Sequence, residues 1–143
     1  MKPEEILKLK RERNAIILAH NYQSLEVQTV AVFVGETLAL AVDANNIENE
    51  AIVFCGPDFM VEIAAILNPD KIVVYANPTA KCPMASMCSA KDIETLQEMY
   101  PGAPVVGYMN MSIECRVKVD ICCGSRNCVS IVRSLDSKQV ILI

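Results

Sequence analysis

The sequence is poor in aromatic residues and in positive charge. Its 143 residues include no tryptophan, three phenylalanines, four tyrosines and a single histidine. The formal net charge is −4, with 13 basic and 17 acidic residues. Surfaces that bind nucleic acid are typically basic and interleaved with aromatic side chains. We therefore expect no nucleic-acid partner.

Long apolar runs and glycine-rich motifs are lacking too. A membrane-spanning helix needs about 18 or more apolar residues in succession, and no segment approaches that length. The opening "MKPEEILKLKRERN" is charged throughout, unlike a secretory signal. The glycine patterns of P-loops and dinucleotide-binding folds are missing, which disfavours a nucleotide ligand. We expect a cytoplasmic protein with no membrane contact and a small-molecule ligand.

Apolar residues and cysteines, in contrast, are abundant. The sequence is 52% hydrophobic, enough for one domain-sized core, and it contains seven cysteines. A reducing compartment disfavours a disulfide framework, so metal ligation or thiol reactivity become more plausible uses of cysteine. The Cys-x2-Cys pairs of structural zinc sites are not present.

Short apolar strands alternate with helical patterns along the chain. Strands that are apolar on both faces and alternate with helices indicate an α/β fold, with short parallel sheets covered by helices on both sides. We expect helices over residues 3–13, 25–44, 58–67 and 90–100, and strands over residues 15–20, 51–56, 71–76 and 103–109.

The sequence also resembles itself. Residues 54–75 align without a gap with residues 122–143, and "IILAHNY" lines up with "VVGYMNM" at a larger offset. This self-similarity predicts two copies of one α/β unit. We place the first unit, with its cysteine loop "KCPMASMC", at residues 1–88 and an incomplete second unit at residues 89–143.

Unusual residues cluster where the expected strands end, and ligands of parallel sheets bind at that edge. His20 is either an acid/base group or carboxylate anchor, or a hydrogen-bonded structural residue. Tyr108 and Asn110 are polar groups that are costly to bury without a partner, which a ligand could supply. Ser125 offers a hydroxyl to an anion. Cys82 is a candidate ligand or nucleophile, although a buried thiol is the alternative.

The other cysteines favour structural roles. Cys122 and Cys123 are adjacent, so a strand sends them to opposite faces, and we expect both to be small buried hydrophobes. Cys55 and Cys115 are interpreted in the same way. Cys88, six residues after Cys82, is the weaker candidate of that loop.

Five blocks, taken in order and spacing, resemble the amino-terminal half of the quinolinate synthase family. They are "ILAHNYQSLEVQTVAVFVGETLALA", "IVFCGPDFMVEIAAILNPDKIVV", "KCPMASMC", "PVVGYMNMS" and "DICCGSRN". The resemblance implies a transferase of NAD biosynthesis, a pyridine nucleotide pathway. Its substrates are iminoaspartate and dihydroxyacetone phosphate, which it condenses to quinolinate, and an aspartate-oxidising enzyme is a potential partner.

The family fold has three similar α/β units around a pseudo-threefold axis, each giving one cysteine to a 4Fe-4S cluster. The open iron of that cluster acts as a Lewis acid. By resemblance Cys82 is the cluster ligand of the first unit, His20 anchors a dicarboxylate, and Tyr22 transfers protons. The implied substrate-binding residues are His20, Thr37, Tyr108, Met109, Asn110 and Ser125.

The sequence also departs from the family. Thr37 stands where serine is usual, Val32 replaces a usual aspartate, "GSRN" a more uniform Thr/Ser run, and Cys128 a common alanine. The family chain is about twice as long, and its other two cluster cysteines lie in the missing part. We therefore expect a fragment or truncated product, or a chain that a second polypeptide completes. The alternative is an apo module that binds dicarboxylates or associates with itself.

Overall fold

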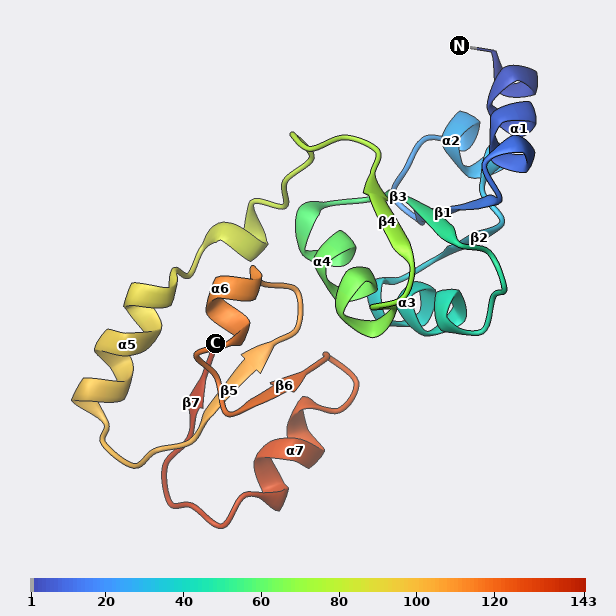
Figure 1. Cartoon of the computed structure of the whole chain (residues 1–143). Coiled ribbons are helices and arrows are strands. Elements are labelled where there is room, and N and C mark those ends of the chain that lie inside the picture. The colour runs from blue at the N-terminus through green and yellow to red at the C-terminus, as the bar shows by residue number, and fades with distance from the viewer. Residues whose placement is uncertain (1) are drawn as a thin grey trace. The chain divides into compact units, whose positions relative to one another are not determined.

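The computed structural model describes residues 2–143 and divides the chain into two compact units, Met1–Lys81 and Cys82–Ile143 (Figure 1). Residues 82–88, which the sequence analysis assigned to the first unit, are grouped here with the second. Both units are α/β, with helices and strands alternating along the chain and every strand pair parallel. The predicted fold class is therefore confirmed.

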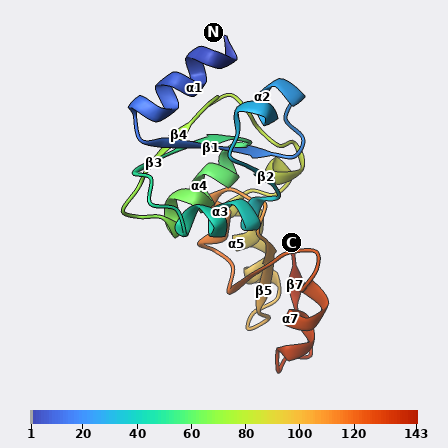
Figure 2. The same ribbon diagram turned by 90° about the vertical axis from the view of Figure 1, so that its right-hand side faces the viewer.

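The first unit is a four-stranded parallel sheet in the order β2-β1-β3-β4. Helices α1 and α2 lie on one side of the sheet and α3 and α4 on the other (Figure 2). The elements are α1 Pro3–Glu12, β1 Ala15–His20, α2 Leu25–Val30, β2 Phe33–Gly35, α3 Thr37–Asn45, β3 Ala51–Cys55, α4 Asp58–Leu67 and β4 Ile72–Tyr75.

The central strand β1 explains why this unit folds. Its first five residues are all buried, so both of its faces are covered and only His20, at its end, is partly exposed. Leu18 packs in a core that also holds Phe54 and Leu40, each 0 or 1% exposed. Burying each such side chain contributes about 1.5–3 kcal/mol.

The long helix predicted over residues 25–44 is wrong. The segment forms two helices, α2 and α3, with the short strand β2 between them. The Val32 N–H donates to the Ile17 carbonyl oxygen at 2.8 Å, and β2 then pairs with β1. The apolar run from Val30 to Val34 is rich in valine, which favours a strand, and periodicity alone does not separate a short apolar strand from a helix.

The second unit is a three-stranded parallel sheet in the order β6-β5-β7. Its core contains Ile93, Val105, Met111, Cys115 and Ile141. The short helix α6 was not predicted. The elements are the 3-10 turn Met84–Ser86, α5 Ala90–Met99, β5 Val105–Tyr108, α6 Ile113–Arg116, β6 Ile121–Cys123, α7 Cys128–Ser134 and β7 Ile141–Leu142.

The two units repeat in one register without a gap. In the first sheet Leu18 pairs with Phe33, and in the second Val106 pairs with Ile121. Each number is 88 higher in the second unit (18 and 106, 33 and 121). All three pairs between β1 and β2 recur between β5 and β6 in this way. The strand β1 therefore corresponds to β5, and β2 to β6.

The same offset governs the third strand and the turn before the first. Ile17 pairs with Val53 as Val105 pairs with Ile141, so β3 corresponds to β7. The positive-φ residues of the described chain, Asn14 at 45° and Gly102 at 80°, also differ by 88 (14 and 102). Each lies in the turn that leads from a helix into the central strand.

The predicted repeat exists, but the predicted alignment of residues 54–75 with 122–143 is wrong. It placed β7 over β4, whereas the ladders place β7 over β3. That alignment rests on five identities, and isolated identities do not report which strands pair. They are Cys55 and Cys123, Gly56 and Gly124, Val61 and Val129, Ile63 and Ile131, and Leu67 and Leu135. The alignment of "IILAHNY" with "VVGYMNM" was off by one residue, because it set His20 over Met109 rather than Tyr108.

Candidate functional site

His20 ends the buried strand β1, and its imidazole has a defined hydrogen-bonding state. Its Nδ1 accepts the backbone N–H of Tyr22 at 3.1 Å. The Tyr22 ring lies against it edge-on, with ring centroids 4.7 Å apart. Because a backbone N–H only donates, the neutral imidazole carries its proton on Nε2. The Nε2–H of His20 is therefore a donor that takes no part in the hydrogen bond with Tyr22.

Partial burial of His20 lowers the pKa of its imidazole, and the nearby Glu36 carboxylate raises it by less. The ring is therefore neutral near pH 7. An anion that binds next to the ring favours the charged form and raises the pKa again. His20 thus fits a group that takes up a proton when an acidic ligand arrives.

Thr37 and Tyr22 complete the strand-end residues of the first unit. Thr37 is the first residue of α3 and is only 5% exposed. Gly35, two residues earlier, pairs with His20 in the sheet, which brings Thr37 to the same edge. Tyr22 is 89% exposed, so its hydroxyl is accessible.

In the second unit, Tyr108 ends β5 and Asn110 follows it. The Asn110 Nδ2 lies 3.5 Å from the Tyr108 hydroxyl oxygen. The Asn110 Oδ1 is buried, and within residues 2–143 it accepts no hydrogen bond. A buried acceptor without a donor is costly. The amide of Asn110 therefore presents an acceptor that a ligand N–H or O–H would satisfy.

Met109 and Ser125 lie beside this pair on adjacent strand ends. The Met109 N–H donates to the Cys123 carbonyl oxygen at 2.8 Å, which joins β5 to β6. Ser125 is exposed in the turn after β6. That turn is closed by the Gly124 N–H, which donates to the Asn127 Oδ1 at 2.8 Å.

The repeat brings the predicted site residues into a pattern that the sequence analysis missed. At the offset of 88, six of them form three equivalent pairs, one member in each unit. The pairs are His20 and Tyr108, Tyr22 and Asn110, and Thr37 and Ser125. A detectable signal was the recurrence of Ser-Leu-Glu at 24–26 as Ser-Ile-Glu at 112–114. Each unit thus presents polar side chains at the same three positions of its sheet.

The loop before Cys82 is anchored to the first unit. The Lys81 ammonium forms an ion pair with the Asp58 carboxylate at the start of α4. The Asp58 N–H donates to the Ala80 carbonyl oxygen at 3.2 Å, and the Tyr75 hydroxyl donates to the same oxygen. Cys82 itself is half-buried. These contacts fix the backbone immediately before the thiol.

Residues 2–143 contain no group of three or more His, Cys, Asp or Glu side chains that could hold a metal ion. Within that range, Cys82 therefore does not lie in a group of three possible metal ligands. The described residues on their own do not fit a 4Fe-4S cluster. Cys115 and Cys123 are buried as expected. The prediction that Cys122 is buried is wrong, because it lies on the opposite side of β6 from Cys123 and is exposed.

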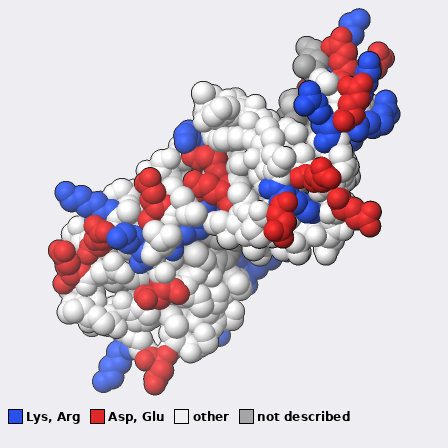
Figure 3. All heavy atoms as spheres, in the orientation of Figure 1, with Lys and Arg blue, Asp and Glu red and all other residues white. Residues whose placement is uncertain are grey.

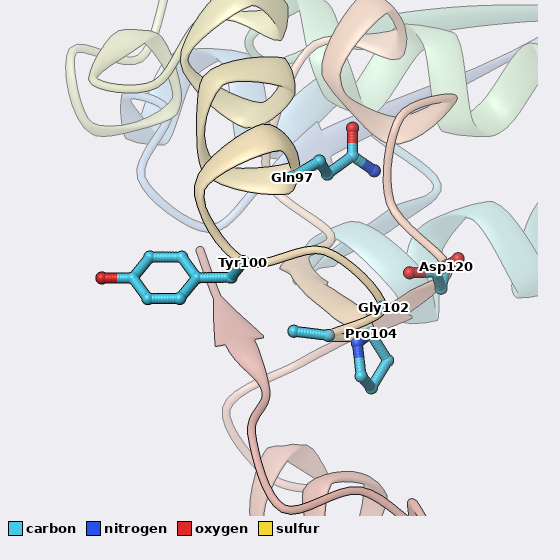
Figure 4. A pocket seen from close by; sticks show the side chains of 6 residues that line it. Gln97, Tyr100, Gly102, Pro104 and Asp120 are labelled. Atoms are coloured by element: carbon cyan, nitrogen blue, oxygen red, sulfur yellow. The ribbon is translucent and has the colours of Figure 1, made fainter.

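A hollow of about 350 Å³ lies elsewhere in the second unit (Figure 4). It is next to Pro104 and Asp120, which precede β5 and β6, and so it lies at the opposite end of the sheet from Tyr108. The Asp120 carboxylate already accepts the Val105 N–H at 2.7 Å. Ligands of parallel sheets bind at the carboxyl ends of strands, so we do not assign the site to this hollow.

Acidic and basic side chains are interspersed on the face drawn in Figure 3. None of the helices described in residues 2–143 is long and apolar enough to cross a membrane.

The fold and the strand-end residues together define an α/β protein of tandem repeated units, with polar side chains at the carboxyl ends of parallel strands. A family model described as Quinolinate synthetase A protein matches residues 4–143. The chain belongs to the quinolinate synthase family.

Curated relatives agree with this assignment. The chain is 50% identical over 139 residues to a quinolinate synthase of Dehalococcoides mccartyi, covering 97% of this chain and 46% of the relative. It is 52% identical over 138 residues to that of Pyrococcus furiosus, covering 96% and 46%. For that of Methanothermobacter thermautotrophicus the identity is 50% over 138 residues, covering 96% and 45%. The chain thus spans about half the length of these relatives.

Proposed function

We propose that this chain provides the amino-terminal, substrate-binding part of a quinolinate synthase. In the complete enzyme it would condense iminoaspartate with dihydroxyacetone phosphate to quinolinate, in de novo NAD biosynthesis in the cytoplasm. The main support is family membership over residues 4–143. A second support is the recurrence of three polar strand-end positions in both units.

In this proposal His20 binds a carboxylate of iminoaspartate. Its neutral ring donates from Nε2, because Nδ1 accepts the Tyr22 N–H. When the dicarboxylate arrives, the ring gains a proton and the hydrogen bond becomes charge-assisted, which roughly doubles its strength. Tyr22, exposed beside the ring, is the proposed proton-transfer group.

Tyr108, Met109 and Asn110 form the proposed substrate-binding segment of the second unit. The buried Asn110 Oδ1 lacks a donor, and an imine or amine N–H of the substrate would supply one. Thr37 and Ser125 supply hydroxyls at equivalent positions and are the proposed hydrogen-bond donors to carboxylate or phosphate oxygens.

Cys82 is the proposed ligand to a 4Fe-4S cluster, as family membership implies for full-length enzymes. One thiolate does not hold such a cluster, so the other ligands would come from outside this chain. The chain's own contribution is the anchored loop at Lys81, which holds the backbone before the thiol. An enzyme that oxidises aspartate would supply iminoaspartate and is a proposed partner.

A titration calorimetry experiment with a stable four-carbon dicarboxylate analogue of iminoaspartate tests the proposed site. We expect saturable binding of an analogue that carries an N–H or O–H group. His20→Ala should weaken it by at least about tenfold, as for loss of a hydrogen bond to a charged group, and Asn110→Ala by about two- to tenfold, as for loss of a neutral one. Gln97→Ala, in the hollow of the second unit, is the matched control and leaves binding unchanged. Loss of binding in Gln97→Ala alone would instead assign the ligand to that hollow.

A second candidate function is a catalytically inactive module that binds dicarboxylates or associates with itself. The unsatisfied Asn110 acceptor favours it, because ligand binding through this group does not require catalysis. Sedimentation with and without the analogue separates the candidates. In a second experiment, the chain is mixed with the carboxyl-terminal half of a relative and reconstituted anaerobically with iron and sulfide. A defined oligomer that binds the analogue but takes up no iron would favour the module.

A further inference from the structure

The turn that carries Tyr22 is held by a side chain to which the proposed function gives no role. The Gln23 N–H donates to the His20 carbonyl oxygen at 2.9 Å, which closes a four-residue turn at the end of β1. Gln28 is half-buried in α2. Its Nε2 donates to the Gln23 carbonyl oxygen at 2.8 Å and to the Asn21 carbonyl oxygen at 3.3 Å. One amide group therefore joins the two carbonyls on either side of Tyr22.

This contact needs hydrogen-bond donors on the Gln28 side chain. Carbonyl oxygens only accept hydrogen bonds, and an amide NH2 group has two N–H bonds to offer. An ionised glutamate has the same shape but only accepts, so it would face two oxygen atoms that also accept. The equivalent position in α6 is Arg116 (28 and 116), whose guanidinium also carries N–H donors. Both units thus place donors at this position of the helix that follows the central strand.

The other backbone groups of the turn show what the Gln28 contact controls. The Asn21 N–H donates to the Gly35 carbonyl oxygen at 3.1 Å, which ties the start of the turn to β2. The Tyr22 N–H donates to the His20 Nδ1 at 3.1 Å. The Tyr22 side chain is 89% exposed, so little of the protein packs against it. The positions of the Tyr22 N–H and of its ring therefore follow the backbone of the turn.

We propose that Gln28 is a positioning residue for His20 and Tyr22, a role that rests on the proposed function of those two side chains. By holding the carbonyls on either side of Tyr22, Gln28 keeps the Tyr22 N–H directed at the His20 Nδ1. The imidazole then keeps its proton on Nε2, where it donates to the carboxylate of the substrate. The Tyr22 ring stays against the imidazole. Gln28 acts on the substrate only through these two residues.

Amide hydrogen exchange, followed by NMR in the 143-residue chain, tests the contact. Gln28→Met keeps the length and the helix propensity of the side chain and removes both N–H donors. We expect the Tyr22 and Gln23 amides to exchange about two- to tenfold faster, as for loss of neutral hydrogen bonds. Unchanged exchange in β1 shows that the variant is folded. Gln97→Met is the matched control, because the Gln97 Nε2 donates to the Lys118 carbonyl oxygen at 3.0 Å in the other unit.

A pH titration of His20 separates positioning from simple stabilisation of the turn. His20 is the one histidine of the sequence, so its imidazole gives a single set of NMR signals. The hydrogen bond that Nδ1 accepts from Tyr22 favours the neutral ring, so its loss in Gln28→Met should raise the pKa of His20 toward its usual value of 6.5. The Glu36 carboxylate, which also raises this pKa, is present in every variant. Gln97→Met should titrate as the wild-type chain does.

Binding of the dicarboxylate analogue connects the contact to the site. We expect Gln28→Met to weaken binding by about two- to tenfold, less than His20→Ala does. Gln28→Glu is the second variant, and its Tyr22 amide should exchange at least as fast as that of Gln28→Met.

Two results would overturn the proposal. One is wild-type exchange at Tyr22 in both Gln28 variants. The other is faster exchange in Gln28→Met with a wild-type pKa of His20 and wild-type affinity, because Gln28 would then only stabilise the turn. If the analogue fails to bind the wild-type chain, the proposed function is contradicted instead, and the exchange and the titration still decide whether Gln28 positions His20 and Tyr22.

Discussion

His20 is the one imidazole of the sequence, and its partial burial has a consequence for stability. Because folding lowers the pKa of His20 below its usual value of 6.5, the unfolded chain binds more protons at mildly acidic pH. The stability that the protein gains from keeping His20 neutral is therefore complete above pH 6.5. It is lost as the pH falls from 6.5 to the lower pKa of the folded state. The nearby Glu36 carboxylate reduces the effect.

We expect His20→Gln to remove this part of the pH dependence. Urea unfolding at pH 7.5 and pH 5.5 measures it as the difference in free energy of unfolding between the two pH values. The wild-type chain should lose more stability on acidification than the variant. An equal loss in both would contradict the lowered pKa of His20.

Truncation of Asn68 should cost more stability than truncation of Asn110. Asn68 is 2% exposed, and its Nδ2 donates to the Ala64 and Ala41 carbonyl oxygens at 2.9 and 3.3 Å. We expect Asn68→Ala to lower the free energy of unfolding by about 1–3 kcal/mol, because two buried side-chain hydrogen bonds are lost. Asn110→Ala removes an acceptor without a donor and should change it by less than about 1 kcal/mol. Urea denaturation of both variants measures this, and a larger loss in Asn110→Ala would contradict a ligand role for its Oδ1.

At the scale of elements, the repeat shows which hydrogen bond a departure from the family removes. Val32 stands where the family usually has aspartate, and its equivalent in the second unit is Asp120 (32 and 120). The backbone N–H groups of both residues donate to equivalent carbonyl oxygens, those of Ile17 and Val105, at 2.8 and 2.9 Å. The Asp120 carboxylate also accepts the Val105 N–H, a bond that the valine side chain cannot make.

We expect Val32→Asp to stabilise the first unit by about 1 kcal/mol, the net value of one hydrogen bond, through the Ile17 N–H. Amide hydrogen exchange should show slower exchange at Ile17. Asp120→Val is the reciprocal control and should speed exchange at Val105. Unchanged exchange at Ile17 in Val32→Asp would contradict the equivalence of these two positions.

The loop before Cys82 should loosen when its ion pair is removed. The Lys81 and Asp58 side chains are 62% and 27% exposed, and exposed ion pairs contribute little to global stability. We therefore expect Lys81→Met to speed amide exchange in residues 77–83 without changing the global unfolding transition. Lys91→Met, on the surface of α5, is a matched control. Equal exchange rates in that loop for both variants would show that the ion pair does not hold it.

At the scale of the whole molecule, the alternation of strands and helices could be predicted because local patterns determine it. The predicted helix over residues 58–67 has the same bounds as α4. The strand β2 could not be predicted, since it depends on pairing with residues far apart in the chain. The repeat register left only a short trace in the sequence, the recurrence of residues 24–26 at 112–114, and the strand ladders establish it. A slip of one residue set His20 over Met109, and in a strand such a slip exchanges the two faces of the sheet.

The candidate site followed from the sequence only in part. Strand ends pointed to His20, Tyr108 and Asn110, and the family resemblance added Tyr22 and Thr37. The tautomer of His20 and the unsatisfied Asn110 acceptor depend on side-chain geometry. No spacing along the chain encodes that geometry.

The most direct test of the central claim replaces the matching amino-terminal part of the Pyrococcus furiosus relative with this chain. The chimera is reconstituted anaerobically with iron and sulfide, and quinolinate formation is measured with iminoaspartate and dihydroxyacetone phosphate. We expect quinolinate and iron-sulfur absorbance near 400 nm, both lost in Cys82→Ser, while His20→Ala loses only the product. A cluster-loaded chimera that makes no quinolinate, or full activity in Cys82→Ser, would contradict the claim.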